Sequence, residues 1–283
     1  MNVAEAIERA RKILDGGQID DARFESELLL WHTLGIDRVQ LYRDSDRSLT
    51  SSEEGAYWGV VERRTSGEPT AYIMGSREFY GANFCVDNRV LIPRPESELL
   101  VEKAIKIAKS RPVEKIVEIG TGSGAIAISL ALNLDGVGIY ATDISLSALS
   151  VARVNCQYHG VRERISFLAG YMLEPLKGPF DIVVANLPYI PSREIARLGL
   201  ADFEPLVALD GGWSGLEKIN RLCSVGENFL GLGGSLLLEV GSGQAKMVAR
   251  TLERLFPHAT LEVITDLAGI DRLLVLSLPL RAE

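Results

Sequence analysis

The first 75 residues alternate apolar and polar positions with helical spacing. One apolar series ends at Gly16-Gly17 and a second ends at Gly35; both then give way to polar residues, as at helix ends. A third segment opens with Thr50 and Glu53 in the spacing of a capping box. Residues 1–75 are therefore predicted to form a small, all-helical domain.

The pattern changes after residue 75. Residues 76–92 carry aromatic and β-branched residues on both sides of Gly81-Ala82-Asn83, which predicts a β-hairpin linker with its turn at those three residues. From residue 93 onward, helical segments alternate with short apolar runs: KIVEIG, GIYATD, ISFLAG, FDIVVAN and SLLLEVG. Continuous apolar strands separated by helices are typical of a parallel sheet covered on both faces.

The last two strands, ATLEVITD and DRLLVLSLPL, are separated only by LAGI. That connection is too short for a crossover, so these two strands are predicted to be antiparallel. The fold class is thus α/β, a seven-stranded, doubly wound, mostly parallel sheet in residues 93–283, with the small helical domain and the hairpin before it.

Composition narrows the function. The chain has 283 residues, 47% hydrophobic, and a formal net charge of −8, which argues against a general nucleic-acid binder. No apolar run is long enough to cross a bilayer and no secretory leader is visible, so no membrane association and a cytoplasmic location are expected. Three cysteines and three histidines are scattered without ligand spacing, so no metal site is predicted.

A glycine-rich turn follows the first strand of this sheet. Gly120, Gly122 and Gly124 stand between a strand and a helix, where backbone N–H groups face a ligand. Asp143 ends the second strand, where a carboxylate can bind both hydroxyls of a ribose. This pattern also matches a dinucleotide fingerprint that would bind a nicotinamide cofactor, and a purely structural turn is the third reading.

Three features favour S-adenosylmethionine over a nicotinamide cofactor: Glu118 inside the first strand, the reversed last strand, and the amide-bearing turn after the fourth strand. Glu118 either balances the positive charge of the ligand or holds the N–H groups of the loop. The predicted cofactor-binding residues are Glu118, Gly120, Thr121, Gly122, Ser123, Gly124, Asp143, Met172 and Asn186.

The fourth strand ends in Asn186-Leu187-Pro188-Tyr189, at the sheet edge where ligands bind in such folds. The side-chain oxygen of Asn186 and the backbone carbonyl of Leu187 are two acceptors suited to the two hydrogens of a planar NH2 group. Tyr189 would add an aromatic wall that excludes water. These four residues are the predicted catalytic set; the alternative is an ordinary Asx turn before a proline.

Taken together, the chain resembles the release factor glutamine methyltransferase family. The resemblance rests on VLIPRPESE, EIGTGSGAIAISLAL, ATDISLSALSVARVN, FDIVVANLPYI and GGSLLLEVGSGQ. It implies S-adenosylmethionine as cofactor and, as protein partner, peptide chain release factors methylated on the glutamine of their Gly-Gly-Gln loop. Because a glutamine in a loop offers little surface for recognition, we expect the helical domain of residues 1–75 to dock this substrate.

The chain departs from the family pattern at three positions. Leu187 stands where the family usually has proline, and Glu118 where it usually has aspartate. Gly170-Tyr171-Met172 replaces a Gly-Asp-Trp sequence whose acid recognises the adenine amino group in relatives. Met172 can still pack against an adenine ring.

Two other functions remain open from the sequence. An N-methyltransferase acting on an exocyclic amino group of a nucleobase would use a similar turn, although it would need a basic cleft. A catalytically eroded binding module would retain the fold without the activity. Neither the oligomeric state nor the identity of the modified release factors follows from the sequence.

Overall fold

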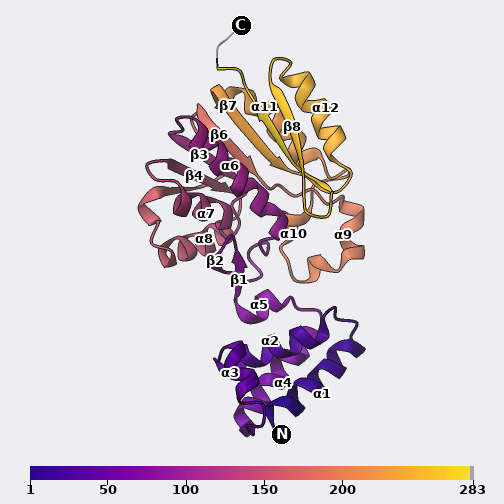
Figure 1. The fold of residues 1–283 in the computed structure, drawn as a ribbon. Coiled ribbons are helices and arrows are strands. Elements are labelled where there is room, and N and C mark those ends of the chain that lie inside the picture. The colour runs from indigo at the N-terminus through magenta and orange to yellow at the C-terminus, as the bar shows by residue number, and fades with distance from the viewer. Residues whose placement is uncertain (281–283) are drawn as a thin grey trace. The chain divides into compact units, whose positions relative to one another are not determined.

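The computed structural model describes residues 1–280, except for the side chains of Leu198 and Leu200. The chain divides into two compact units, Met1–Ser76 and a second that begins at Arg77 (Figure 1). In the described part of the chain, no helix is both long and apolar enough to cross a membrane.

Residues 1–76 contain helices α1 (Val3–Gly16), α2 (Ala22–Leu34), α3 (Arg38–Arg43), α4 (Ser51–Thr65) and α5 (Thr70–Met74). The predicted capping box is present at the start of α4, where the Glu53 N–H donates to Thr50 Oγ1 at 3.2 Å and the Thr50 N–H donates to Glu53 Oε2 at 2.8 Å. These helices enclose a core of their own, centred on Leu29, Leu30 and Tyr57. The all-helical prediction for this region is confirmed.

Strands β1 (Ser76–Phe79) and β2 (Ala82–Cys85) form the predicted hairpin. The predicted turn residues were partly wrong, because the turn consists of Tyr80 and Gly81, with φ of 51° and 74°. Two central residues with positive φ match the twist of the flanking strands, so the turn closes in two residues. Ala82 and Asn83 consequently belong to β2.

Within the described residues, seven strands form one sheet in the order β5-β4-β3-β6-β7-β9-β8. Their bounds are β3 (Lys115–Ile119), β4 (Gly138–Asp143), β5 (Ile165–Ala169), β6 (Phe180–Ala185), β7 (Leu230–Glu239), β8 (Thr260–Thr265) and β9 (Asp271–Ser277). β9 is antiparallel to both of its neighbours, and the pairs among β3 to β7 are parallel. The predicted sheet, including its reversed strand, is confirmed.

Successive residues of the central strands enter two different cores. In β6, Ile182 and Val184 pack on one face, whereas Val183 and Ala185 pack on the other. Helices α6 (Glu98–Ser110), α7 (Ala125–Asn133) and α8 (Leu146–Tyr158) cover the first face, and α11 (Glu217–Gly226) and α12 (Ala245–Leu255) cover the second. Burial on both faces explains why these strands read as continuous apolar runs.

The remaining elements are short. They comprise η1 (Pro95–Ser97) before α6, η2 (Arg162–Arg164) before β5, and η4 (Glu227–Phe229) before β7. Between β6 and α11 lie α9 (Ser192–Leu198), η3 (Leu200–Asp202) and α10 (Leu206–Leu209). The free thiols of the described residues are Cys85, Cys156 and Cys223.

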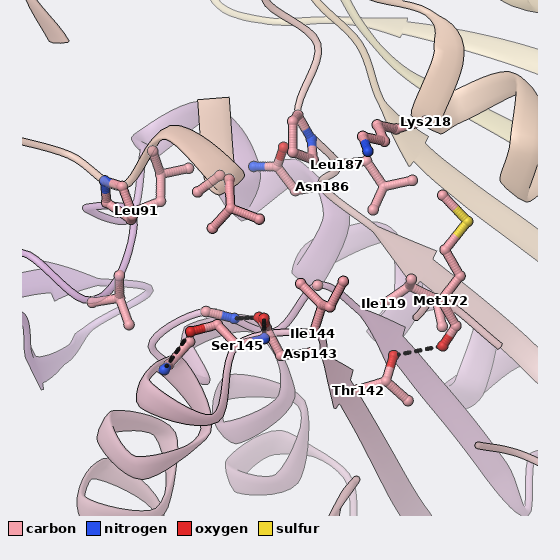
Figure 2. A pocket seen from close by; sticks show the side chains of 18 of the residues that line it. Leu91, Ile119, Thr142, Asp143, Ile144, Ser145, Met172, Asn186, Leu187 and Lys218 are labelled. Atoms are coloured by element: carbon pink, nitrogen blue, oxygen red, sulfur yellow. Dashed lines mark hydrogen bonds between the residues drawn. The ribbon is translucent and has the colours of Figure 1, made fainter. Parts of the chain in front are cut away.

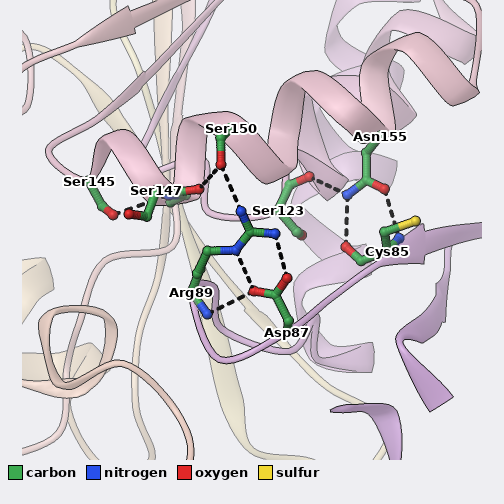
Figure 3. Close-up of polar contacts among 9 residues, drawn as sticks. Cys85, Asp87, Arg89, Ser123, Ser145, Ser147, Ser150 and Asn155 are labelled. Carbon is green, nitrogen blue, oxygen red and sulfur yellow. Dashed lines mark hydrogen bonds and ion pairs between the residues drawn. The ribbon is translucent and has the colours of Figure 1, made fainter. Parts of the chain in front are cut away.

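Asn155 of α8 joins the hairpin to the glycine loop (Figure 3). Its Oδ1 accepts the Cys85 N–H at 2.7 Å, and its Nδ2 donates to the carbonyls of Cys85 and Ser123, both at 2.9 Å. The residue is fully buried. One side chain thus satisfies three backbone groups from two segments and sets where the hairpin lies against the loop.

Replacement of Asn155 by Ala is expected to lower the free energy of unfolding of the sheet-containing unit by about 3 kcal/mol, because buried backbone groups lose their partners. Urea unfolding measures this loss. The matched control is Asn133→Ala, because exposed Asn133 makes a single bond to the Ser129 carbonyl at 2.9 Å and should cost at most about 0.5 kcal/mol. Equal losses in the two variants would contradict the joining role of Asn155.

Candidate active site

The glycine loop connects β3 to α7 and lies over the end of β4. The N–H groups of Gly120 and Thr121 donate to the Thr142 carbonyl at 2.9 and 3.0 Å. Gly120 has φ of 76°, and a Cβ there would lie 3.5 Å from the side chain of Leu187. The loop is therefore held against both neighbours of β3 in the sheet.

Glu118 lies beneath this loop with 2% of its surface exposed. Its Oε2 accepts the Thr121 hydroxyl at 2.6 Å and the Ala127 N–H at 3.0 Å. Burial raises the pKa of the Glu118 carboxyl to about 8, Asp143 adds to the rise, and the two hydrogen bonds oppose it. Of the two roles considered for Glu118, the hydrogen bonds place it as the group that holds the loop.

Asp143 ends β4 beside a cavity of about 130 Å³ that is open to solvent. The Asp143 carboxylate accepts the N–H groups of Gly122 at 2.9 Å and Ser145 at 2.8 Å (Figure 2). Burial raises its pKa, and these backbone bonds oppose the rise. A carboxylate has about four acceptor positions, so two remain for a ligand. The predicted ribose position is thus at the cavity wall.

The end of β5 supplies another wall of the same cavity, which Gly170, Tyr171 and Met172 line. Met172 has φ of 51°, and its carbonyl accepts the Thr142 hydroxyl at 2.9 Å. Lys218 also lines this wall, with Nζ 5.7 Å from the centre of the Tyr171 ring. The family pattern described above has an acid at position 171, whereas this chain has an aromatic ring beside an ammonium group.

Asn186 follows β6 and lines the main cavity and two smaller ones beside it. Figure 2 shows Asn186 and Leu187 across the cavity from Asp143 and Ser145. Asn186 Nδ2 donates to Ser97 Oγ at 2.8 Å, and Ser97 Oγ donates to Glu239 Oε2 at 2.5 Å. The amide is consequently held from behind by two buried side chains.

The other residues of the predicted catalytic turn are fixed by packing and by backbone bonds. Leu187 is 6% exposed and belongs to the core of one sheet face, while Pro188 lines the cavity. The Tyr189 carbonyl accepts Gln244 Nε2 at 2.9 Å, and its hydroxyl lies 3.4 Å from Glu239 Oε1. Burial raises the pKa of Tyr189 to about 12. Asn186 to Tyr189 therefore form a supported turn, with more contacts than an isolated Asx turn has.

Not every predicted cofactor residue faces the main cavity. Glu118, Thr121 and Ser123 line a smaller cavity on the other side of the loop, together with Gly120 and Gly122. Gly124 has φ of 83°, and a Cβ there would lie 3.2 Å from that of Ala152 on α8. Gly124 therefore brings two helices close together, and we find it outside the lining of the cavities described above.

Sequence reasoning missed several residues at the site. Ser97 and Glu239 support Asn186, and Arg94 forms an ion pair with the buried Glu204 beside the smaller cavities. The sequence feature that could have identified Glu239 is a charged residue inside an apolar strand, in SLLLEVG. In residues 1–280, no group of three or more His, Cys, Asp or Glu side chains is arranged to hold a metal ion.

The sheet is parallel except for one reversed strand, and its edge brings a glycine loop, the Asp143 carboxylate and an Asn-x-Pro-Tyr turn around one cavity. This arrangement is that of a class I methyltransferase. Comparison with known proteins agrees. Residues 5–75 match the family described as the PrmC N-terminal domain, and residues 101–197 match ribosomal protein L11 methyltransferase (PrmA).

Curated relatives extend this likeness over nearly the whole chain. The release factor glutamine methyltransferase of Bradyrhizobium diazoefficiens is 39% identical over 281 residues, covering 95% of this chain and 93% of that one. The enzyme of the same name from Chlorobaculum tepidum is 40% identical and covers 90% of each chain. A solved methyltransferase from Pyrococcus furiosus shares the fold, with a TM-score of 0.53, 17% identity, and coverage of 71% of this chain and 90% of its own. This chain belongs to the release factor glutamine methyltransferase family.

Replacement of Glu118 by Gln is expected to flatten the pH dependence of stability. The pKa of Glu118 is about 8 in the folded protein and returns to about 4.3 in an unfolded chain. Between these values the folded state binds more protons, so the contribution of Glu118 to stability declines as pH rises and levels off above about pH 8. Gln retains an acceptor oxygen for Thr121 and Ala127.

Urea unfolding of both proteins at about pH 5 and about pH 9 measures the difference between their slopes. Glu239 titrates in the same direction, but it is common to both proteins and cancels. Identical pH slopes would show that Glu118 is already ionised in the folded state.

Proposed function

We propose that this protein transfers a methyl group from S-adenosylmethionine to the side-chain amide nitrogen of the glutamine in the Gly-Gly-Gln loop of peptide chain release factors. The observation that carries the proposal is the Asn186 amide, held by Ser97 at the wall of a cavity whose opposite wall holds Asp143. Family membership supplies the class of substrate. Because that substrate acts in translation, we infer a cytoplasmic location.

The residues present suit S-adenosylmethionine. The Asp143 carboxylate would accept the ribose hydroxyls, and Ile119, Ile144 and Met172 provide apolar walls for the adenine ring. The loop from Gly120 to Gly122 would lie against the methionine portion, where its glycines allow a close approach of the backbone. Its own N–H groups are already bonded to Thr142 and Asp143. The bound cofactor supplies an electrophilic methyl group on a sulfonium.

The chain's own residues position the nitrogen that receives this methyl group. An amide nitrogen is a weak nucleophile because its lone pair is delocalised, so catalysis depends on orientation and electrostatics. Asn186 Oδ1 and the Leu187 carbonyl would each accept one hydrogen of the substrate NH2 group. Both hydrogens are then engaged, and the nitrogen is held toward the cofactor. The half-buried Tyr189 ring would help to exclude water from this side.

Replacement of Asn186 by Ala is expected to lower turnover by about 10² to 10³, the usual loss for one preorganised polar contact in an active site. Cofactor affinity should change little. The matched variant is Asp143→Ala, which should weaken cofactor binding by about 1.5 to 3 kcal/mol, as for loss of hydrogen bonds to a charged group. Calorimetry measures affinity, and mass spectrometry of the Gly-Gly-Gln peptide measures turnover.

The same assay decides between the proposed function and its alternatives. One added methyl group on the glutamine of purified release factor supports the proposal. Methylation of an RNA or DNA substrate offered in parallel would instead indicate a nucleobase methyltransferase. Failure to bind S-adenosylmethionine would indicate a binding module that has lost the activity.

We also propose that residues 1–75 dock the release factor. A single glutamine offers little surface for recognition, and this region has a core of its own. Removal of residues 1–75 is expected to abolish methylation of intact release factor while cofactor binding, measured by calorimetry, persists. A truncated chain that binds cofactor and methylates release factor at the normal rate would exclude this role.

A further inference from the structure

Two buried polar side chains, Ser97 and Glu239, form a hydrogen-bonded series that ends at the partly exposed Asn186 amide. Ser97 closes η1 and is 3% exposed, and Glu239 closes β7 and is 2% exposed. Asn186 Nδ2 donates to Ser97 Oγ at 2.8 Å, and the Ser97 hydroxyl donates to Glu239 Oε2 at 2.5 Å. The three side chains come from segments far apart in the sequence and meet behind the wall of the cavity.

The protonation state of Glu239 determines which atom donates in each of these hydrogen bonds. A hydroxyl has one proton, and an ionised carboxylate can only accept. When Ser97 gives its proton to Glu239, its oxygen can only accept from Asn186. Asn186 must then turn its NH2 group inward, which leaves Oδ1 toward the cavity.

Protonation of Glu239 allows the donors and acceptors of these hydrogen bonds to be reversed. A carboxylic acid can donate to Ser97, whose own proton is then available to Asn186 Oδ1. The amide of Asn186 would rotate and present its NH2 group to the cavity. Two NH2 groups would then face each other, an arrangement that cannot hold a glutamine side chain by its nitrogen.

We propose that Ser97 and Glu239 are positioning residues that fix the orientation of the Asn186 amide, so that Oδ1 accepts a hydrogen of the substrate NH2 group. This inference rests on the proposed function and deepens it. Neither residue touches the reacting atoms; both act through Asn186.

The surroundings of Glu239 place this reversal near neutral pH. Burial raises the pKa of Glu239 to about 7, and Glu96 of η1 adds to the rise, whereas Arg272 of β9 and the hydrogen bonds from Ser97 and Tyr189 oppose it. Arg272 is itself paired with Asp266 at 2.8 Å, which limits its effect on Glu239. Turnover should therefore fall as pH decreases through about 7.

The test uses the full chain with saturating S-adenosylmethionine and purified release factor, from about pH 6 to about pH 9. The wild-type protein should show a fall in kcat on the acid side. Glu239→Gln retains the shape of the side chain but does not titrate and can either donate or accept. We expect kcat at about pH 8 to fall roughly 10- to 100-fold, with the acid-side dependence lost and cofactor affinity within about twofold of wild type.

Ser97→Ala removes the hydroxyl that links Asn186 to Glu239 and should lower kcat by the same factor. The double variant should lose no more than either single variant, because both act through one amide. Ser97→Thr retains the hydroxyl and should recover most of the activity. The matched control is Ser235→Ala, which removes another buried serine of the same unit, one bonded to Ser277 at 3.2 Å, and should leave kcat unchanged.

The outcomes separate the two proposals. If the wild-type protein methylates no glutamine, the proposed function fails. If it methylates glutamine, and Glu239→Gln or Ser97→Ala retains wild-type kcat and its pH profile, the positioning role is overturned and the function stands. Fully additive losses in the double variant would also overturn it. Glu118 is unchanged in all of these proteins, so its titration cancels when the pH profile of Glu239→Gln is compared with that of the wild-type protein.

Discussion

The hydrogen bonds that Glu118 accepts hold the glycine loop that forms one wall of the main cavity. They fasten the glycine loop to the strand before it, through Thr121, and to the helix after it, through Ala127. The loop in turn presents Gly122 to Asp143 and lies against Leu187. The loop that contacts both Asp143 and Leu187 is therefore held by one buried carboxyl group, although Glu118 itself lines only the smaller cavity behind the loop.

A second buried carboxyl group, Glu239, stands behind the other half of the site. Burying a charge costs free energy unless it is paired or hydrogen-bonded, and both Glu118 and Glu239 respond by an upward shift in pKa. An apolar residue at either position would pack well within the sheet. What the carboxyl group adds is direction, since it dictates which neighbouring groups donate and which accept.

The fold could be predicted from sequence because its signals are local. Period, turn residues and connection length predict the strands, the reversed β9 and the capping box at Thr50. The glycine loop and Asp143 could also be predicted, because strand, loop, helix and acid follow one another closely. The turn at Tyr80 was missed because a tyrosine with positive φ leaves no signature in the sequence.

The supporting groups behind the site could not be predicted in the same way. Ser97 and Asn186 are 89 residues apart, Ser97 and Glu239 are 142 apart, and Asn155 and Cys85 are 70 apart. Their meeting depends on strand order and on which face each helix covers. Gly124 was predicted to bind the cofactor because it belongs to the glycine motif in the sequence. Its contact with α8 depends on tertiary packing, which the motif does not reveal.

The wall formed by Tyr171 shows how a departure from the family pattern can be accommodated. An acid there accepts a hydrogen from an adenine amino group, whereas the Lys218 ammonium, 5.7 Å from the Tyr171 ring, can only donate. Adenine carries ring nitrogens that accept as well as an amino group that donates. If adenine binds at this wall as proposed, Lys218 can donate to a ring nitrogen, while the ring of Tyr171 and the side chain of Met172 supply apolar contact. Under the proposed function, the absence of the acid would therefore change which atoms of the base are recognised.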